Sequence, residues 1–281
     1  MAQWFEQDLV QEVLSSLQVS LARQLAVLTQ RATPETVHNT RISIRRLRVA
    51  LRAMKHELRS ATRKRYLADL RQFSLDLERA REAVALGSAV ERLLKHPLTI
   101  DRAPISSLVA KLAAERAQAH QELRGLIATA GWRLRIRQLE RYSRERLTTD
   151  PCLASLLTIR DALARRQRRL RRALRHVGST PRKLHRLRLK IKETRYLDED
   201  FGPLLSMSQD EGLKRLRQLQ DRLGEFRDNY RLKKWLRSQS DQSFARSLRH
   251  SLNARQERLR KVIEQLCREL REDPIAAEIA A

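Results

Sequence analysis

The chain has 281 residues and a formal net charge of +26, because 59 Lys and Arg outnumber 33 Asp and Glu. Repulsion at this charge disfavours a compact chain, so a bound anion is expected to stabilise the fold. The two cysteines, Cys152 and Cys267, lack metal-ligand spacing and argue against a disulfide framework. No run of about 18 apolar residues exists, so we expect no membrane-spanning segment and no membrane partner. Residues 1–10 lack the pattern of a signal peptide, and a cytoplasmic location is therefore expected.

The pattern of breaks predicts long helices and no β-sheet. Aromatic residues make up only 4% of the chain, and strand-type alternation is scarce. The first half is expected to form helices over 3–30, 34–59 and 62–86, a short helix or turn over 87–97, a loop over 97–104, and a helix over 105–128 that breaks near Gly131 and continues to 147. Thr33 and Pro34 are typical of an N-cap and of the first helical position.

The second half follows the same order. Helices are expected over 151–177, 181–201, 208–237 and 242–271, and Ser208 with Glu211 has the spacing of a capping box. This order predicts an all-α fold of two pseudo-symmetric, antiparallel four-helix bundles that arose by internal duplication. The expected units are residues 1–148 and 149–272, followed by a flexible tail over 273–281.

A pattern of one His and several cations occurs twice in the sequence. The two copies are Thr33-Pro34-x-x-Val37-His38-x-x-Arg41-x-x-Ile44-Arg45-x-x-Arg48 and Thr180-Pro181-x-x-Leu184-His185-x-x-Arg188-x-x-Ile191-Lys192-x-x-Arg195. A second match relates Leu70, Leu77 and Arg81 to Leu216, Leu223 and Arg227. These matches indicate an internal repeat.

Each copy places its charged residues on one side of a helix. Positions 0, 3, 7 and 10 fall within roughly 80° of one another, at about 100° per residue. In the first copy Arg52, Lys55 and Arg59 continue the stripe, so that residues 38–59 span about 32 Å. A solvated helix normally alternates the sign of its charges. A stripe of one sign therefore favours a long, thin polyanion as the partner.

Further basic residues occur on the neighbouring predicted helices. Arg71 is ten residues before Arg81, and Arg217 is ten residues before Arg227, which puts each pair on roughly one side of its helix. An acid follows the second Arg of each pair. These acids, Glu82 and Asp228, are expected either to orient neighbouring Arg side chains or to form plain interhelical ion pairs.

His38 and His185 stand at the head of the two stripes. A single His on a helix is commonly structural, but two at matched positions favour a role in anion binding. A metal role is the weaker alternative, because no third or fourth ligand has suitable spacing.

Three motifs carry a family resemblance. They are Val37-His38-x-x-Arg41-x-x-Ile44-Arg45-Arg46-Leu47-Arg48, Leu184-His185-x-Leu187-Arg188-x-x-Ile191-Lys192-x-x-Arg195-Tyr196 and Leu219-Gln220-Asp221-x-Leu223-Gly224-x-x-Arg227-Asp228. Over about residues 5–272 the chain resembles the CHAD family, the conserved-histidine α-helical domains. The resemblance implies two helical bundles with a basic central cavity or channel that binds inorganic polyphosphate, and association with polyphosphate granules.

The leading interpretation is a binding protein that is not an enzyme and needs no cofactor. Phosphate or sulfate ions are expected to fit the same site. The residues expected to bind polyphosphate come from both repeats: His38, Arg41, Arg45, Arg48, Arg52, Lys55, Arg71, Arg81, His185, Arg188, Lys192, Arg195, Lys214, Arg217 and Arg227. Asp228 and Glu82 are the expected orienting acids.

The two repeats differ at matched positions. Glu78 and Glu82 stand where the second repeat has Gly224 and Asp228, and Glu193 stands opposite Arg46. These differences predict unequal contributions from the two halves. The chain also lacks a Glu-x-Glu-x-Lys signature, so the hydrolase activity of relatives fused to a triphosphate-tunnel domain is not implied.

Two other functions stay open. A pI of about 11.3 and the Arg-rich run over 165–172 would suit a nucleic-acid-binding protein, but no helix-turn-helix, zinc or RRM signature occurs and stacking aromatics are few. An enzyme acting on phosphoanhydrides would need a phosphate loop, an acidic magnesium cluster or a nucleophile–base pair, and the sequence has none of these signals. Nucleic acid is therefore the secondary partner, and catalysis is not expected.

Overall fold

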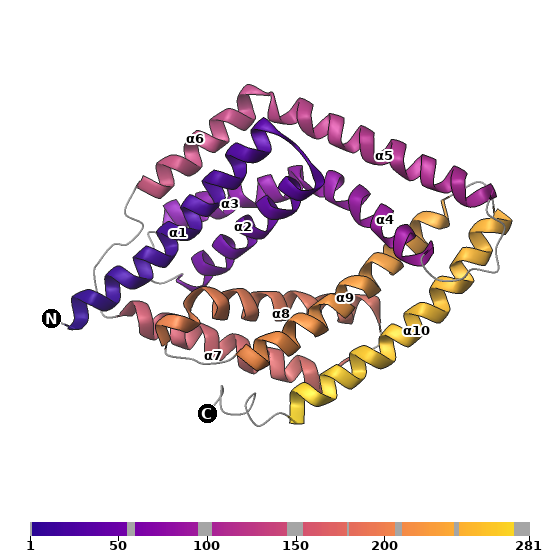
Figure 1. Cartoon of the computed structure of the whole chain (residues 1–281). Helices are drawn as coiled ribbons and strands as arrows, with labels where there is room; N and C mark the ends of the chain where they lie inside the picture. Colours follow the sequence, from indigo (N-terminus) through magenta and orange to yellow (C-terminus); the bar gives the residue numbers. More distant parts are fainter. Residues whose placement is uncertain are drawn as a thin grey trace. The chain divides into compact units, whose positions relative to one another are not determined.

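The computed structural model describes residues 2–54, 60–94, 103–144, 154–178, 180–205, 210–238 and 242–272. These residues form helices and no strands, which confirms the predicted all-α fold (Figure 1). The helices are α1 (Ala2–Gln30), α2 (Pro34–Ala53), α3 (Ser60–Asp76), α4 (Glu78–Leu94), α5 (Ala103–Ile127), α6 (Ala130–Arg144), α7 (Ala154–Arg175), α8 (Pro181–Phe201), the short 3-10 helix η1 (Gly202–Leu205), α9 (Asp210–Leu236) and α10 (Gln242–Glu272).

The chain divides into two compact units, each assembled from several segments. Unit 1 comprises residues 1–82, 117–165 and 196–208, and unit 2 comprises residues 83–116, 166–195 and 209–281. These units follow spatial contacts rather than sequence repeats. The internal duplication, with bundles over 1–148 and 149–272, therefore stays a prediction, and the expected tail over 273–281 lies outside the described residues.

Unit 1 is built around α1 and α2, which lie side by side (Figure 1). Leu14, Leu21, Leu25 and Leu28 recur with a helical period on α1 and are almost completely buried. Phe201, the last residue of α8, packs in the same hydrophobic core. The apolar spacing of these helices thus determines which side of α2 is buried and which side is left for its charges.

Aromatic packing links α3 to α6 within unit 1. Phe73 and Trp132 meet edge to face, with 4.7 Å between ring centroids, an arrangement that suits the charge distribution of the two rings. The Arg135 guanidinium lies over both rings and forms an ion pair with Asp76 at 3.0 Å. These contacts hold α3, which also supplies a polar contact to the cationic face of α2.

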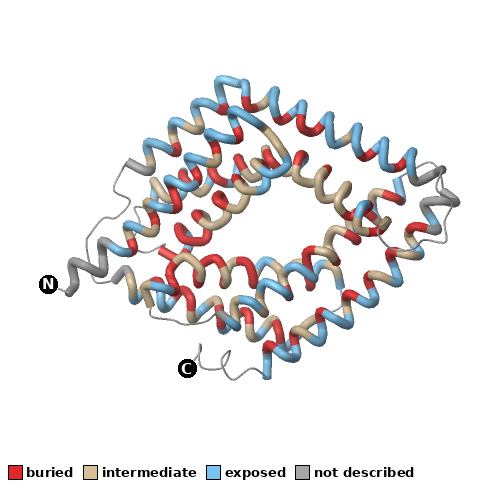
Figure 2. The backbone as a smooth tube through the Cα atoms, in the orientation of Figure 1, coloured by how far each residue is buried: buried red, intermediate tan, exposed pale blue. Residues whose placement is uncertain are grey.

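Unit 2 has two apolar clusters. One contains Leu174, Leu187, Leu223 and Ile263, from α7, α8, α9 and α10 respectively. The other joins α4 and α5 to the C-terminal end of α9 and the N-terminal part of α10. Buried positions alternate with exposed ones along α10 (Figure 2), as expected for an amphipathic helix on a core.

The only described cysteine, Cys267, belongs to the first of these clusters. Its side chain is 2% exposed, and burial raises the pKa of the thiol to about 12. The thiol therefore behaves as a small apolar core group at neutral pH.

The beginning of α2 agrees with the prediction. The Thr36 amide donates to Thr33 Oγ1 at 3.2 Å, and the Thr33 amide donates to Thr36 Oγ1 at 2.8 Å, while Pro34 occupies the first helical position. This reciprocal cap sets the starting point of α2 and hence the register of its charged face. The predicted end of this helix at residue 59 is wrong, because α2 ends at Ala53 and Met54 is no longer helical. Residues 55–59 lie outside the described residues.

The predicted helix over 62–86 is also wrong, because it is two helices. Leu77 separates α3 from α4, although the Leu77 amide donates to Phe73 O and the Arg81 amide donates to Leu77 O, at 3.1 and 3.2 Å. Gly87 does not end α4, which continues to Leu94. Burial of Val90 in the next turn outweighs the cost of about 1 kcal/mol for a helical glycine. The predicted capping box cannot be placed, since Ser208 lies outside the described residues.

A buried carboxyl group near the end of α8 makes the stability of unit 1 depend on pH. Asp198 is 5% exposed; burial, reinforced by the charge of Glu199, raises its pKa from 3.8 to about 6. Because the folded protein favours the neutral acid, ionisation of Asp198 lowers the free energy of unfolding. This loss is absent below about pH 4 and grows as the pH rises from about 4 to about 6. The full cost above pH 6 is at most about 3 kcal/mol.

We expect Asp198→Asn to stabilise the protein by about 1–3 kcal/mol at pH 7, because the amide removes a buried charge. Urea unfolding at pH 4 and pH 7 measures this difference. The gain should vanish at pH 4, where the native Asp198 is neutral. An equal gain at both pH values would show that ionisation of Asp198 is not its cause.

Candidate functional site

The candidate site in unit 1 is the cationic face of α2, formed by Arg41, Arg45, Arg48 and Arg52. The helical period separates this face from Val37, Ile44, Leu47 and Leu51, which are buried in the core. Arg41, Arg45 and Arg48 are half-buried, whereas Arg52 and His38 are exposed. The predicted stripe is therefore present on α2, with its guanidinium groups at the edge of the core.

Ser74 of α3 positions two of these side chains. Arg41 Nη1 donates to Ser74 O at 2.6 Å, and Arg48 Nη1 donates to Ser74 Oγ at 3.4 Å. The Ser74 hydroxyl in turn donates to Leu70 O at 2.9 Å, which leaves its oxygen lone pairs available to Arg48. Two guanidinium groups are thus directed by neutral oxygens, which do not themselves neutralise a positive charge.

Arg46 lies on the same helix but has a structural role. It donates through Nε to Asp200 Oδ1 at 2.8 Å, and the Asp200 side chain is 3% exposed. Burial alone would lower the pKa of Arg46, but the hydrogen bond with Asp200 raises it overall. The charge of Arg46 is therefore compensated within unit 1 by Asp200.

The candidate site in unit 2 joins α8 to α9. Arg227 Nη1 lies 2.9 Å from His185 Nδ1 and 3.3 Å from Nε2. A guanidinium can only donate, so His185 accepts through an unprotonated ring nitrogen in this contact. His185 thus orients Arg227 without neutralising its charge.

Arg188 lies one turn further along α8, directly against Gly224 of α9. A Cβ added at Gly224 would lie 3.3 Å from Arg188 Nη2 and 3.5 Å from Nε. Because the 3.3 Å contact is tighter than ordinary packing, the absence of a side chain at Gly224 makes room for the guanidinium. Gly224 is therefore a site residue that the sequence pattern indicated only as part of a motif.

The remaining cations of α8 differ in burial. Lys192 is 9% exposed and Arg195 is half-buried. An ammonium group this deep is costly unless it is solvated by other polar groups. The α8 stripe therefore combines cations at several depths and is not a fully solvated helix face.

Asp228 of α9 forms an ion pair with α4. It accepts a hydrogen bond at 3.2 Å from Arg92 of α4, a residue that the sequence pattern did not indicate. Arg92 also presents its backbone carbonyl to Arg255 of α10, whose guanidinium contacts Glu225. The described contact makes Asp228 an interhelical ion-pair partner, one of its two expected roles.

The other predicted residues lie as follows. Arg71, Lys214 and Arg217 are exposed, whereas Arg81 and Glu82 are half-buried. Lys55 lies outside the described residues. The structure thus brings together Arg41 with Arg48 in unit 1, and His185 with Arg227 in unit 2. The predicted cavity shared by both repeats stays a prediction.

Within the described ranges, no group of three or more His, Cys, Asp or Glu side chains is arranged to hold a metal ion. None of the described helices is long and apolar enough to cross a membrane.

Comparison with solved structures supports the fold. The chain resembles the crystal structure of the CHAD domain from the plant Ricinus communis, with a TM-score of 0.69, 20% identity and coverage of 94% of this chain and 92% of that one. It also resembles PptA from Streptomyces chartreusis, with a TM-score of 0.72, 17% identity and coverage of 97% and 99%. No curated protein matches the chain.

The sequence itself matches a family model over most of its length. The CHAD domain model covers residues 12–237, a range that includes both His-headed stripes, Ser74, Gly224 and Arg227. The chain belongs to the CHAD domain family.

Proposed function

We propose that this protein binds inorganic polyphosphate through the cationic faces of α2 and α8 and does not hydrolyse it. The observation that supports the proposal is that each face has Arg side chains held in place by a second helix. Ser74 directs Arg41 and Arg48, and Gly224 makes room for Arg188. Guanidinium groups that are already placed lose little freedom on binding and offer paired donors to phosphate oxygens.

The spacing of the cations favours a polymer over a single phosphate. Arg41 and Arg52 are separated by about 16 Å along α2, at 1.5 Å per residue. A chain with a negative charge on each phosphate can contact all four Arg side chains of this face at once. Use of both repeats by one polymer, and association with polyphosphate granules in the cytoplasm, are parts of the same proposal. A fluorescent fusion that forms no foci in polyphosphate-containing cells would contradict the granule association.

Polyphosphate binding is expected to weaken steeply with salt, because each Arg–phosphate contact releases a counterion. If four or more cations of α2 engage the chain, the logarithm of the association constant should fall with the logarithm of salt concentration with a slope of roughly −3 or steeper. Titration of labelled polyphosphate at several NaCl concentrations measures this slope. A slope near zero would contradict the proposal.

Competition assays distinguish this proposal from nucleic-acid binding. Unlabelled polyphosphate should displace the labelled chain at lower phosphate concentration than duplex DNA or single-stranded RNA does. The reverse order would favour nucleic acid. Phosphate release with and without added divalent metal tests the absence of catalysis, and turnover that copurifies with the protein would contradict it.

A further inference from the structure

Unit 2 has a basic pocket that the proposed function does not use. It measures about 300 Å³ and lies where the end of α7 meets the beginning of α8. Its charged lining consists only of basic residues: Arg172, His176, Lys183, Arg186 and Lys190. Among the described residues none of these five side chains forms an ion pair, so the pocket presents uncompensated positive charge.

This pocket is on the opposite side of α8 from the His185 stripe. At about 100° per residue, Lys183, Arg186 and Lys190 lie about 100–160° around the helix from His185. Arg188, Lys192 and Arg195 lie within about 80° of His185 in the other direction. A ligand in the pocket therefore cannot be the same bound group that contacts the stripe.

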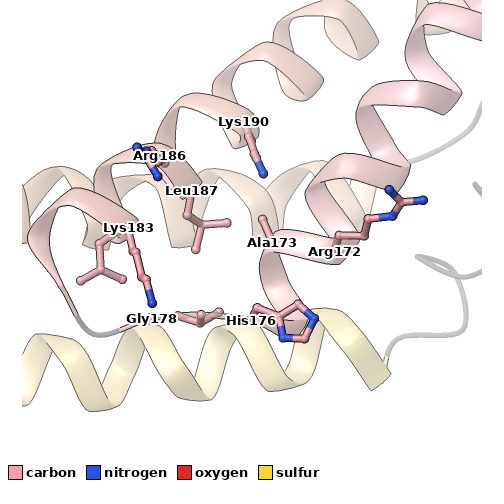
Figure 3. A pocket seen from close by; sticks show the side chains of 10 residues that line it. Arg172, Ala173, His176, Gly178, Lys183, Arg186, Leu187 and Lys190 are labelled. Atoms are coloured by element: carbon pink, nitrogen blue, oxygen red, sulfur yellow. The ribbon is translucent and has the colours of Figure 1, made fainter.

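The side chains around the pocket are arranged to receive an anion. In Figure 3 the Lys190 ammonium group extends into the space between the two helices, and the Lys183 side chain runs towards Gly178. His176 stands at the rim, and Arg172 lies at the outer edge with its guanidinium directed away from the pocket. Ala173 and Leu187 supply an apolar floor. The volume matches the lower end of ordinary ligand pockets, which suits a few phosphoryl groups better than a bulky ligand.

Gly178 leaves room for the Lys183 side chain. A Cβ on Gly178 would overlap the Lys183 side chain and would lie 3.1 Å from its Nζ. The aliphatic part of Lys183 thus packs on the glycine while its ammonium group reaches the pocket.

Helix α7 adds further positive charge beside the pocket. Burial, together with the charges of Arg175 and Arg168, lowers the pKa of Arg171. Cations crowded in this way repel one another, and an anion bound nearby relieves that repulsion.

We propose that this outer pocket is a second binding site for condensed phosphate, such as a segment of two to four phosphoryl groups. Lys183 and Lys190 are its principal donors, and Gly178 positions Lys183. Together with the His185 stripe, the pocket makes unit 2 bivalent, so that one molecule can join two polyphosphate segments. The bivalency rests on the proposed function of the stripe, whereas binding in the pocket does not.

Calorimetric titration of the full chain with tripolyphosphate tests the pocket. Lys183→Gln with Lys190→Gln should remove one set of sites, with affinity at that set falling at least about tenfold for the loss of two charged donors. The matched control is Lys234→Gln with Lys261→Gln, which removes two exposed lysines of the same unit. It should leave the affinity of every set of sites within about twofold, since isolated surface charges contribute little. Equal losses in both variants would overturn the proposal.

Two further variants make the result specific. Gly178→Ala displaces Lys183 without changing net charge, and it should weaken the same set of sites. Arg188→Gln with Arg195→Gln should remove the set on the α8 stripe and leave the pocket set intact. If this stripe variant bound tripolyphosphate like the wild type while the lysine variant lost a set of sites, the proposed function of the stripe would be wrong and the pocket proposal would be supported. If the lysine variant lost affinity for duplex DNA but none for tripolyphosphate, the assigned ligand would be wrong.

Discussion

Replacing Arg45 and Arg188 together by Ala is expected to weaken polyphosphate binding about 100-fold. Each of these Arg side chains lies on the cationic face of a different unit, α2 in unit 1 and α8 in unit 2. A hydrogen bond to a charged group contributes about 1.5–3 kcal/mol, so that the loss of two such contacts corresponds to roughly two orders of magnitude in affinity. Filter binding or fluorescence anisotropy with a labelled chain measures the effect.

The matched control for this variant is Arg137→Ala with Arg258→Ala. Both residues are exposed, and they lie on α6 of unit 1 and α10 of unit 2. The net charge falls equally in the two double variants, so a purely electrostatic attraction would weaken binding equally. We expect the control to lose less than about threefold, because exposed charges act weakly and are screened by salt. Comparable losses would remove α2 and α8 from the binding site.

A substitution that preserves charge provides an independent test. Gly224→Val should weaken polyphosphate binding about tenfold, although every cation of the chain is retained. The Val side chain would occupy the space in which the Arg188 guanidinium lies, given that even a Cβ would stand 3.3 Å from Nη2. Loss of one charged hydrogen bond accounts for a factor of this size.

The helix itself should tolerate Gly224→Val, because Val has a higher helix propensity than Gly. Gly212→Val on the same helix is the control, since a Cβ at Gly212 would meet no atom within 4 Å. Circular dichroism should show equal helix content in both variants. Full binding by Gly224→Val would mean that Arg188 does not contact the ligand from this position.

The sequence was sufficient to predict the charged face of α2. Thr33 and Pro34 marked its beginning, and the spacing of Val37, Ile44 and Leu47 placed the cations away from the core. These features are local, because a cap needs residues three apart and a helix face needs only its period. The structure agrees with both.

The contacts that hold the cations could not be predicted from these patterns. Ser74 acts on Arg41 through its backbone carbonyl, an atom that every residue carries, so no residue type signals this contact. Arg92 reaches Asp228 across a sequence separation of 136 residues, and only the packing of α4 against α9 decides that pairing. Gly87 was expected to break a helix, but the burial of Val90 outweighs its weak helix propensity.

Because Cys267 is buried in the unit 2 core, the reactivity of its thiol reports whether that core is intact. A thiol whose pKa is raised to about 12 contains almost no thiolate at neutral pH, and its position in the unit 2 core blocks access by reagents. After Cys152 is replaced by Ser, alkylation of the remaining sulfur can proceed only when that core opens. The rate of mass increase with iodoacetamide would then separate variants that loosen the scaffold from variants that only lose affinity.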